Sequence, residues 1–167
     1  MRIGIRHLPS ARLFTSFACM IAMADGQTYF TILLILSILL SFAFPIPPVL
    51  YTPYTYFGAI LIGFGLVIAF WGRSLFMKGK TTLSPYGLST SLVTDGPFRI
   101  SRNPMYLGMA AILLGVAVLL GTLFAFAFPV LFAWIIETLF IPNEEKKLEK
   151  TFGEKYRKYK KKVRRWL

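Results

Sequence analysis

The sequence has 167 residues but only one cysteine, Cys19, and one histidine, His7. A single cysteine excludes an intramolecular disulfide framework, and one cysteine with one histidine cannot build a metal cluster within a monomer. Catalysis by a serine–histidine or cysteine–histidine pair would depend on His7, which lies in a short basic N-terminal segment. Disulfide scaffolds, zinc clusters and histidine-dependent nucleophilic catalysis are therefore disfavoured.

Basic residues are absent from two long stretches, 13–72 and 103–145. Hydrophobic residues make up 56% of the chain, and the mean hydropathy is +0.61. This apolar content is higher than a soluble domain of the same size needs to fill its core. The composition therefore predicts an integral membrane protein.

Four stretches approach the about 20 apolar residues that a helix needs to cross a bilayer. They are residues 28–44, 54–77, 105–120 and 122–141. Only Gly121 separates the last two, which predicts a tight helical hairpin or a sharply broken helix. The shorter apolar stretch 13–24 is either a further span or an interfacial helix. We predict an all-α, polytopic membrane helix bundle with four to five transmembrane helices, comprising N-terminal membrane helices in 1–53 and a core in 54–167.

The net charge of +12 would also suit a nucleic-acid-binding protein. The basic residues border the apolar spans, however, and the tail 142–167 holds eleven basic and four acidic residues. This distribution follows the positive-inside rule and suits anionic lipid headgroups. We therefore expect membrane lipids rather than nucleic acid as partners, with the loop 78–103 and the tail in the cytoplasm; the oligomeric state stays open.

The tail has the pattern of an amphipathic helix. Asn143 suits an N-cap, and Glu144 and Glu145 would then lie in the first turn, where acidic residues favour the helix dipole. Apolar and aromatic residues recur at steps of three and four: Leu148, Phe152, Tyr156, Tyr159, Val163 and Trp166. The pattern predicts a cytoplasmic amphipathic C-terminal helix, bent at Gly153, on the membrane surface or folded back onto the spans.

Polar residues with possible chemistry collect in these two predicted cytoplasmic segments. The candidates are Asp95, Arg99, Arg102, Asn103, Tyr106, Glu144 and Glu145. An arginine can hold a carboxylate through two hydrogen bonds and a carboxylate can hold an ammonium, so the set suits an amino-acid-like ligand. A purely structural role fits as well, with a snorkelling Arg102, an Asn103 cap and Pro104 in the first turn. Glu137, about one turn inside a predicted span, is expected to face the protein interior.

Two blocks of the sequence together carry a family resemblance. The first reads Gly96-Pro97-Phe98 and then Arg102-Asn103-Pro104-Met105-Tyr106-Leu107-Gly108; the second reads Glu144-Glu145, Leu148, Phe152-Gly153, Tyr156 and Tyr159. With the hairpin between them, residues 55–167 resemble the isoprenylcysteine carboxyl methyltransferase family and related membrane phospholipid and amine methyltransferases. Two positions depart from the family pattern: Asn103 stands at the family's histidine, and Phe140 stands at an arginine that contacts the substrate in eukaryotic members.

The resemblance implies an integral membrane enzyme that binds S-adenosylmethionine in a pocket facing the cytoplasm and needs no metal. By position, the cofactor-binding residues would be Leu92, Val93, Phe98, Asn103, Pro104, Met105, Tyr106, Glu144 and Glu145. The candidate catalytic residues are Glu144, Arg102 and Arg99, with one arginine holding a carboxylate of the cofactor or the acceptor. The expected reaction is carboxyl O-methylation of an isoprenylcysteine-like lipidated acceptor that enters from the bilayer.

Two alternatives remain at this point. On the same scaffold, the enzyme would be a phospholipid or amine N-methyltransferase, and an acidic residue such as Glu144, Glu145 or Glu137 would then have to accept a proton. Alternatively, the protein would be a non-enzymatic membrane scaffold whose basic tail binds anionic lipid.

Overall fold

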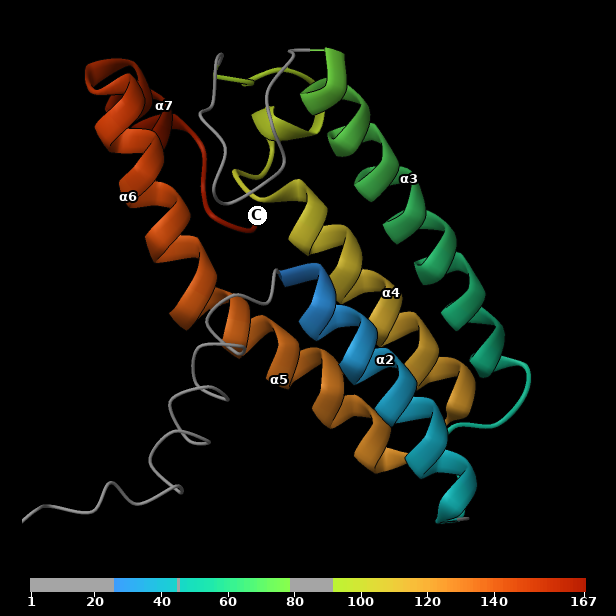
Figure 1. The fold of residues 1–167 in the computed structure, drawn as a ribbon. Coiled ribbons are helices and arrows are strands. Elements are labelled where there is room, and N and C mark those ends of the chain that lie inside the picture. Colours follow the sequence, from blue (N-terminus) through green and yellow to red (C-terminus); the bar gives the residue numbers. More distant parts are fainter. Residues whose placement is uncertain (1–25, 45, 79–91) are drawn as a thin grey trace, which may run out of the picture.

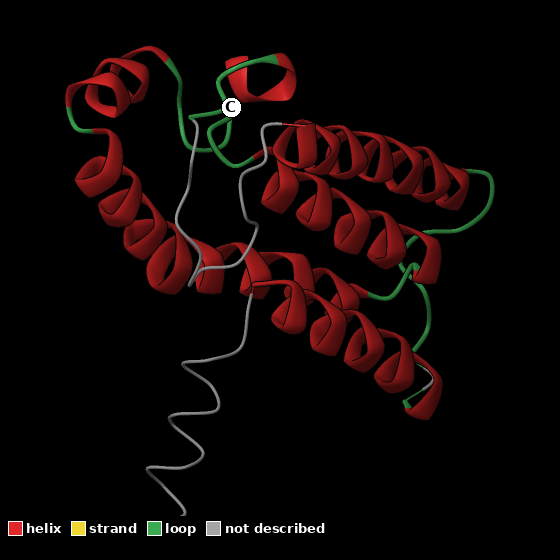
Figure 2. Ribbon diagram, turned by 45° about the horizontal axis from the view of Figure 1, so that its top comes forward, coloured by secondary structure: helices red, strands yellow, loops and turns green. Residues whose placement is uncertain are grey.

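The computed structural model describes residues 26–44, 46–78 and 92–167. Within these ranges every regular element is helical, and β-type pairing is limited to one isolated bridge between Ser101 and Arg164 (Figure 2). The all-α class predicted from the sequence is confirmed for this part of the chain. The predicted helix at 13–24 lies outside the described residues.

The longer helices run back and forth along one bundle (Figure 1). They are α2 (Gly26–Ala43), α3 (Phe57–Lys78), α4 (Pro104–Leu120), α5 (Ala127–Ile135), α6 (Ile141–Phe152) and α7 (Glu154–Lys162). The 3-10 turns η1 (Tyr54–Tyr56), η2 (Gly96–Arg99) and η3 (Leu123–Phe126) precede α3, α4 and α5, and the π-helical η4 (Ile136–Phe140) joins α5 to α6.

Three of the described helical stretches are long and apolar enough to cross a membrane: Gly26–Ala43, Tyr54–Leu75 and Leu123–Phe152. Helix α4 is also apolar but shorter, with 17 residues. Large apolar side chains on their outer surfaces are exposed, among them Phe42 at 78% and Val130 at 70%. Such surfaces are unfavourable in water and suit contact with lipid. The structure thus supports a helical membrane protein, and the number of crossings stays a prediction.

Helices α3 and α4 approach closely because glycines face each other across their interface. A Cβ atom added at Gly65 would lie 2.5 Å from the carbonyl oxygen of Gly108, and one added at Gly115 would lie 2.6 Å from that of Gly58. Small residues allow this backbone contact in membrane helix pairs. These four glycines therefore allow the two helices to approach, whereas Gly63 faces open space.

Gly121 ends α4 and turns the chain into a hairpin. Its φ of +66° lies in the left-handed region that favours glycine, and its N–H donates to Ala117 O at 3.0 Å. The Gly121 carbonyl accepts from the backbone N–H groups of Val49 and Leu50, at 2.8 and 3.2 Å. Helix α5 then returns antiparallel to α4, so the hairpin rather than the broken helix is found.

The predicted start of the tail helix at Asn143 is wrong. The helix from α5 continues through η4 into α6, and the Asn143 side-chain amide donates to Leu139 O at 2.7 Å instead of capping a helix. Pro142 lacks an N–H group, and the π-helical segment just before it, in which Ile141 N–H donates to Ile136 O, admits the proline without ending the helix.

The end of the predicted tail helix also differs. Gly153, with φ of +51°, separates α6 from α7, so the predicted bend is a break between two helices. Helix α7 ends at Lys162 and the chain becomes extended from Val163. Trp166 therefore lies outside the helix, because the residues after Lys162 pair with the loop that precedes α4 instead of continuing the helical hydrogen bonds.

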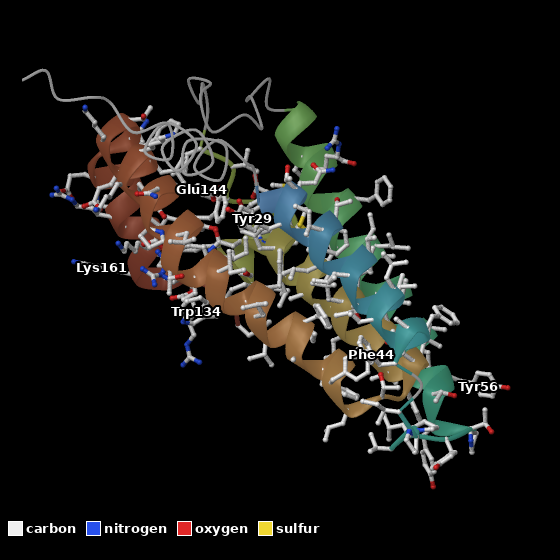
Figure 3. All side chains as sticks on the ribbon, turned by 60° about the horizontal axis from the view of Figure 1, so that its bottom comes forward. Tyr29, Phe44, Tyr56, Trp134, Glu144 and Lys161 are labelled. Carbon is white, nitrogen blue, oxygen red and sulfur yellow. The ribbon has the colours of Figure 1, made fainter. Side chains whose placement is uncertain are left out.

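The charged residues of the tail gather at one end of the bundle. Glu144 and Lys161 lie at this end, and Phe44 and Tyr56 lie at the opposite end (Figure 3). The apolar core, with Leu33, Leu113, Phe132 and Ile136 among its members, lies between α2, α4 and the α5–α6 helix. The loop 92–103 reaches the charged end as well, so both blocks of the sequence resemblance meet there.

Candidate functional site

A cleft lies at the charged end, between the loop 92–103 and helices α6 and α7. Its lining combines apolar, aromatic and charged side chains: Leu92, Val93, Phe98, Arg102, Asn103, Glu144, Glu145, Leu148, Tyr156 and Tyr159. A mostly apolar cleft with a few converging polar groups is the usual form of a small-molecule site.

Arg102 is the buried cation of this cleft. Its side chain is 9% exposed, and Nη1 lies 2.8 Å from Glu145 Oε1, within ion-pair distance. Nη1 therefore has an anionic partner, whereas Nε donates no hydrogen bond to any residue that the structure describes. Buried donors of this kind are rare in proteins because their desolvation is costly. The guanidinium is therefore suited to an anionic group of a ligand.

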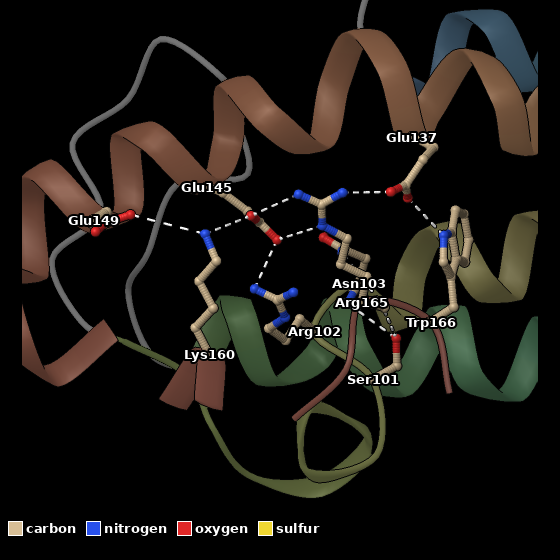
Figure 4. A network of polar contacts seen from close by, with 9 residues as sticks. All are labelled: Ser101, Arg102, Asn103, Glu137, Glu145, Glu149, Lys160, Arg165 and Trp166. Carbon is tan, nitrogen blue, oxygen red and sulfur yellow. Dashed lines mark hydrogen bonds and ion pairs between the residues drawn. The ribbon is translucent and has the colours of Figure 1, made fainter. Parts of the chain in front are cut away.

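Glu145 is the centre of a network of ion pairs (Figure 4). Besides Arg102, it binds Lys160 through Oε2 at 3.1 Å and receives two hydrogen bonds from Arg165, Nε to Oε1 at 3.1 Å and Nη2 to Oε2 at 3.2 Å. The Arg165 Nη1 atom donates to Glu137, which also accepts from Trp166 Nε1 at 2.8 Å. The hydrogen bonds with Glu145 and Glu137 raise the pKa of Arg165 above its usual range.

Glu144 precedes Glu145 in α6 and is held by a residue of α4. Tyr106 on α4 donates its hydroxyl to Glu144 Oε1 at 2.6 Å. Gly26, the first residue of α2, packs so closely on the Tyr106 ring that a Cβ atom there would lie 2.6 Å from Cε1. The start of α2 thereby fixes the ring, and the ring fixes the carboxylate beside the cleft.

Two tyrosines of α7, Tyr156 and Tyr159, also line the cleft. Tyr159 donates its hydroxyl to the Phe98 carbonyl at 2.6 Å, which ties α7 to the loop. Burial, followed by the negative charge of Glu145, raises the pKa of Tyr156 to about 12. Burial, followed by the neighbouring Tyr156, raises the pKa of Tyr159 to about 12 as well. Both phenols therefore stay protonated at neutral pH and act as neutral groups.

The structure brings most of the sequence-predicted residues to the cleft but separates the two arginines. Arg99 pairs with Asp95 at 3.0 Å on the surface, where its side chain is 75% exposed. It does not line the described cleft, whereas Arg102 does. Leu92, Val93 and Phe98 line the apolar side, together with the polar residues Asn103, Glu144 and Glu145.

Three predicted residues lie behind the cleft wall. Tyr106 reaches the site through Glu144, and Pro104 and Met105 point toward Gly72 of α3 instead of the described lining, with Met105 Cγ 3.1 Å and Pro104 Cγ 3.7 Å from a Cβ atom built there. The Asn103 amide, at the position of the family's histidine, donates to the Arg165 carbonyl at 3.3 Å.

Several residues of the site were not predicted from the sequence. Leu148, Tyr156 and Tyr159 belong to the second block of the resemblance, so their spacing was a usable signal for the cleft lining. Lys160 and Arg165 belong to a tail with many lysines and arginines, and neither residue type nor spacing distinguishes them from the other basic residues there. Their roles follow from ion pairs that the sequence does not reveal.

The fold and the site together define a helical membrane protein with a polar cleft at one end of its bundle. The model of the phospholipid methyltransferase family matches residues 54–155. The chain therefore belongs to the phospholipid methyltransferase family, a group of membrane methyltransferases related to the isoprenylcysteine carboxyl methyltransferases. An uncharacterized protein of Haemophilus influenzae is 44% identical over 63 residues, which are 38% of this chain and the whole of that relative. No solved structure matches.

Proposed function

We propose that the protein transfers a methyl group from S-adenosylmethionine to a lipid-like acceptor at the cleft of the charged end. The observation that carries this proposal is the buried Arg102 guanidinium, whose Nε makes no hydrogen bond to the described residues, beside the Glu144 carboxylate. Family membership supports a methyl donor of this type.

The cleft residues suit the amino-acid end of this cofactor. Arg102 would hold the carboxylate through the Nε edge of its guanidinium, since this edge matches a carboxylate with two parallel hydrogen bonds and Nη1 is paired with Glu145. Glu144, oriented by Tyr106, would hold the ammonium group. Leu92, Val93 and Phe98 provide an apolar surface for the nucleoside. The cofactor would supply an electrophilic methyl group on a sulfonium.

The acceptor that these residues favour is a carboxylate, as in an isoprenylcysteine-like lipid. Each of the six acidic residues that the structure describes already pairs with a cation or accepts a hydrogen bond: Asp95, Glu137, Glu144, Glu145, Glu149 and Glu154. A carboxylate acceptor is ionised before it reacts and needs none of them as a base. The chain then contributes mainly by positioning the two reactants and excluding water.

An amine of a phospholipid or small molecule is the second candidate, because the matching family is described as phospholipid methyltransferases. An ammonium must lose a proton before methyl transfer. Glu144 would have to accept that proton while it is bound by Tyr106. In both cases the basic tail supports a cleft on the cytoplasmic side by the positive-inside rule, and the acceptor would enter laterally from the bilayer.

The chemical stability of the product separates the two candidates. We expect vesicles that contain the full-length protein and methyl-labelled S-adenosylmethionine to label a prenylcysteine analogue, with the label released as methanol by base, because methyl esters hydrolyse and N-methyl groups do not. A parallel reaction uses extracted lipids as acceptors, and the Glu144→Ala variant serves as the control for enzyme-dependent label. Base-stable label in lipid would favour the amine candidate, and no label in either acceptor would contradict the proposed reaction.

Replacing Tyr106 tests the cofactor site without the acceptor. We expect Tyr106→Phe to weaken binding of S-adenosylhomocysteine, the demethylated cofactor, by about tenfold, because Glu144 loses a charge-assisted hydrogen bond and its orientation. Calorimetry in detergent measures this affinity. Tyr54→Phe is the matched control, since Tyr54 is 63% exposed at the far end of the bundle. Equal affinity in the two variants would remove Tyr106 from the proposed site.

A further inference from the structure

The last residues of the chain, 163–167, form a contact with the loop before α4 that we call the C-terminal clasp. The Arg102 N–H donates to Arg164 O at 2.9 Å, and the Ser101 hydroxyl donates to Arg165 O at 2.9 Å. The Asn103 amide adds a longer bond to the same Arg165 carbonyl. Three consecutive loop residues, one of them Arg102, are thereby attached to the backbone of the clasp.

The side chains of the clasp reach in the opposite direction, to the α5–α6 helix. Arg165 binds both oxygens of Glu145 and also reaches Glu137, and Trp166 donates to Glu137. The clasp therefore joins the loop to the helix across the cleft end (Figure 4). Arg165 itself does not line the described cleft, so any effect on a ligand passes through the residues that it holds.

Glu145 is the residue through which Arg165 acts on Arg102. The Arg165 guanidinium donates to both carboxylate oxygens of Glu145, Oε1 and Oε2, and the Lys160 ammonium pairs with Oε2. Arg102 Nη1 forms an ion pair with the same Oε1 at 2.8 Å, so the two arginines share this oxygen. Without Arg165, Glu145 would be paired by Arg102 and Lys160 alone, and its carboxylate would be free to rotate toward the Nε edge of Arg102, which a ligand would otherwise bind.

We infer that Arg165 is a positioning residue of the cofactor site: by occupying Glu145, it keeps the Arg102 guanidinium available for the carboxylate of the cofactor. This inference rests on the proposed function. Asn103 has a supporting role in it, because its side chain binds the clasp backbone. An imidazole N–H can donate to a carbonyl as well, so Asn103 at the position of the family's histidine is compatible with the same attachment.

The test compares two ligands that differ in the group that Arg102 would bind. S-adenosylhomocysteine carries the amino acid, whereas methylthioadenosine keeps the nucleoside and lacks both the amino and the carboxylate group. For Arg165→Gln in the full-length protein, we expect about tenfold weaker binding of S-adenosylhomocysteine and less than a twofold change for methylthioadenosine. Calorimetry, with competition for the weaker ligand, gives both values.

Two further variants make the result specific. Arg165→Lys keeps the charge but not the two-pronged contact, so we expect an intermediate loss for S-adenosylhomocysteine alone. Arg157→Gln is the matched control in the same tail, since Arg157 pairs with Glu149 and Glu154 on the surface, with 58% of its side chain exposed, and should leave both affinities unchanged.

An equal loss for both ligands in Arg165→Gln and Arg165→Lys would show a merely structural role and overturn the inference, as would unchanged affinities. If the wild-type protein binds neither ligand, the proposed function fails instead, which separates the two conclusions.

Discussion

Arg102→Gln is expected to weaken binding of S-adenosylhomocysteine by at least about thirtyfold, which corresponds to about 2 kcal/mol. The substitution removes the buried charge whose Nε makes no hydrogen bond to the described residues. It also leaves Glu145 with Lys160 and Arg165 as its remaining cations, so the carboxylate stays paired. Titration calorimetry of the purified protein in detergent measures the loss.

Arg99→Gln is the matched control for this experiment. Arg99 lies three residues earlier, but its side chain is 75% exposed and pairs with the equally exposed Asp95. Exposed ion pairs contribute about 0–1 kcal/mol, so we expect less than a twofold change in affinity. Similar affinities for the two variants would contradict the assignment of the carboxylate to Arg102.

Gly65→Ala is expected to destabilise the protein by about 1–3 kcal/mol, because one added methyl group meets backbone on the facing helix. Its Cβ atom would lie 2.5 Å from Gly108 O and 3.0 Å from Ile112 N, so α3 and α4 would have to separate. Helix α3 also supports the loop 92–103, since Gly96 packs against Trp71 and Leu75. Thermal unfolding in detergent measures the loss of stability.

Gly63→Ala provides the control on the same helix. A Cβ atom at Gly63 meets nothing within 4 Å, so its effect should stay within about 0.5 kcal/mol. Equal unfolding temperatures for Gly63→Ala and Gly65→Ala would show that the close approach of α3 and α4 does not control stability.

Much of the fold could be predicted from local patterns. Apolar runs of nearly the length of a bilayer crossing predicted α2, α3 and α4, and Gly121 marked the turn between α4 and α5. The boundary at Asn143 could not be predicted in the same way. Asn and the acidic residues after it have the composition of a helix start, but the continuous helix through η4 and α6 prevailed because packing and the π-helical segment accommodate Pro142.

The candidate site could likewise be predicted in part: the sequence indicated its segments, and the fold decided the role of each side chain. Its two blocks were recognisable because Arg102, Pro104 and Tyr106, and then Glu144 and Glu145, occur at a characteristic spacing around a hairpin. The hairpin then places both blocks at one end of the bundle, so the sequence alone was sufficient to expect a shared pocket. Cleft-lining roles for individual residues depend on where each side chain points.

The sequence by itself determined the membrane class, the apolar helices and the segments that carry the polar groups, because length, periodicity and composition act locally along the chain. Only the tertiary structure decided that Arg102 is buried in the cleft while Arg99 is on the surface, and that Arg165 holds Glu145. A run of basic residues offers many equivalent charges, and an ion pair selects one of them by distance and direction. These are properties of the folded arrangement of the loop, α6 and the C-terminal clasp.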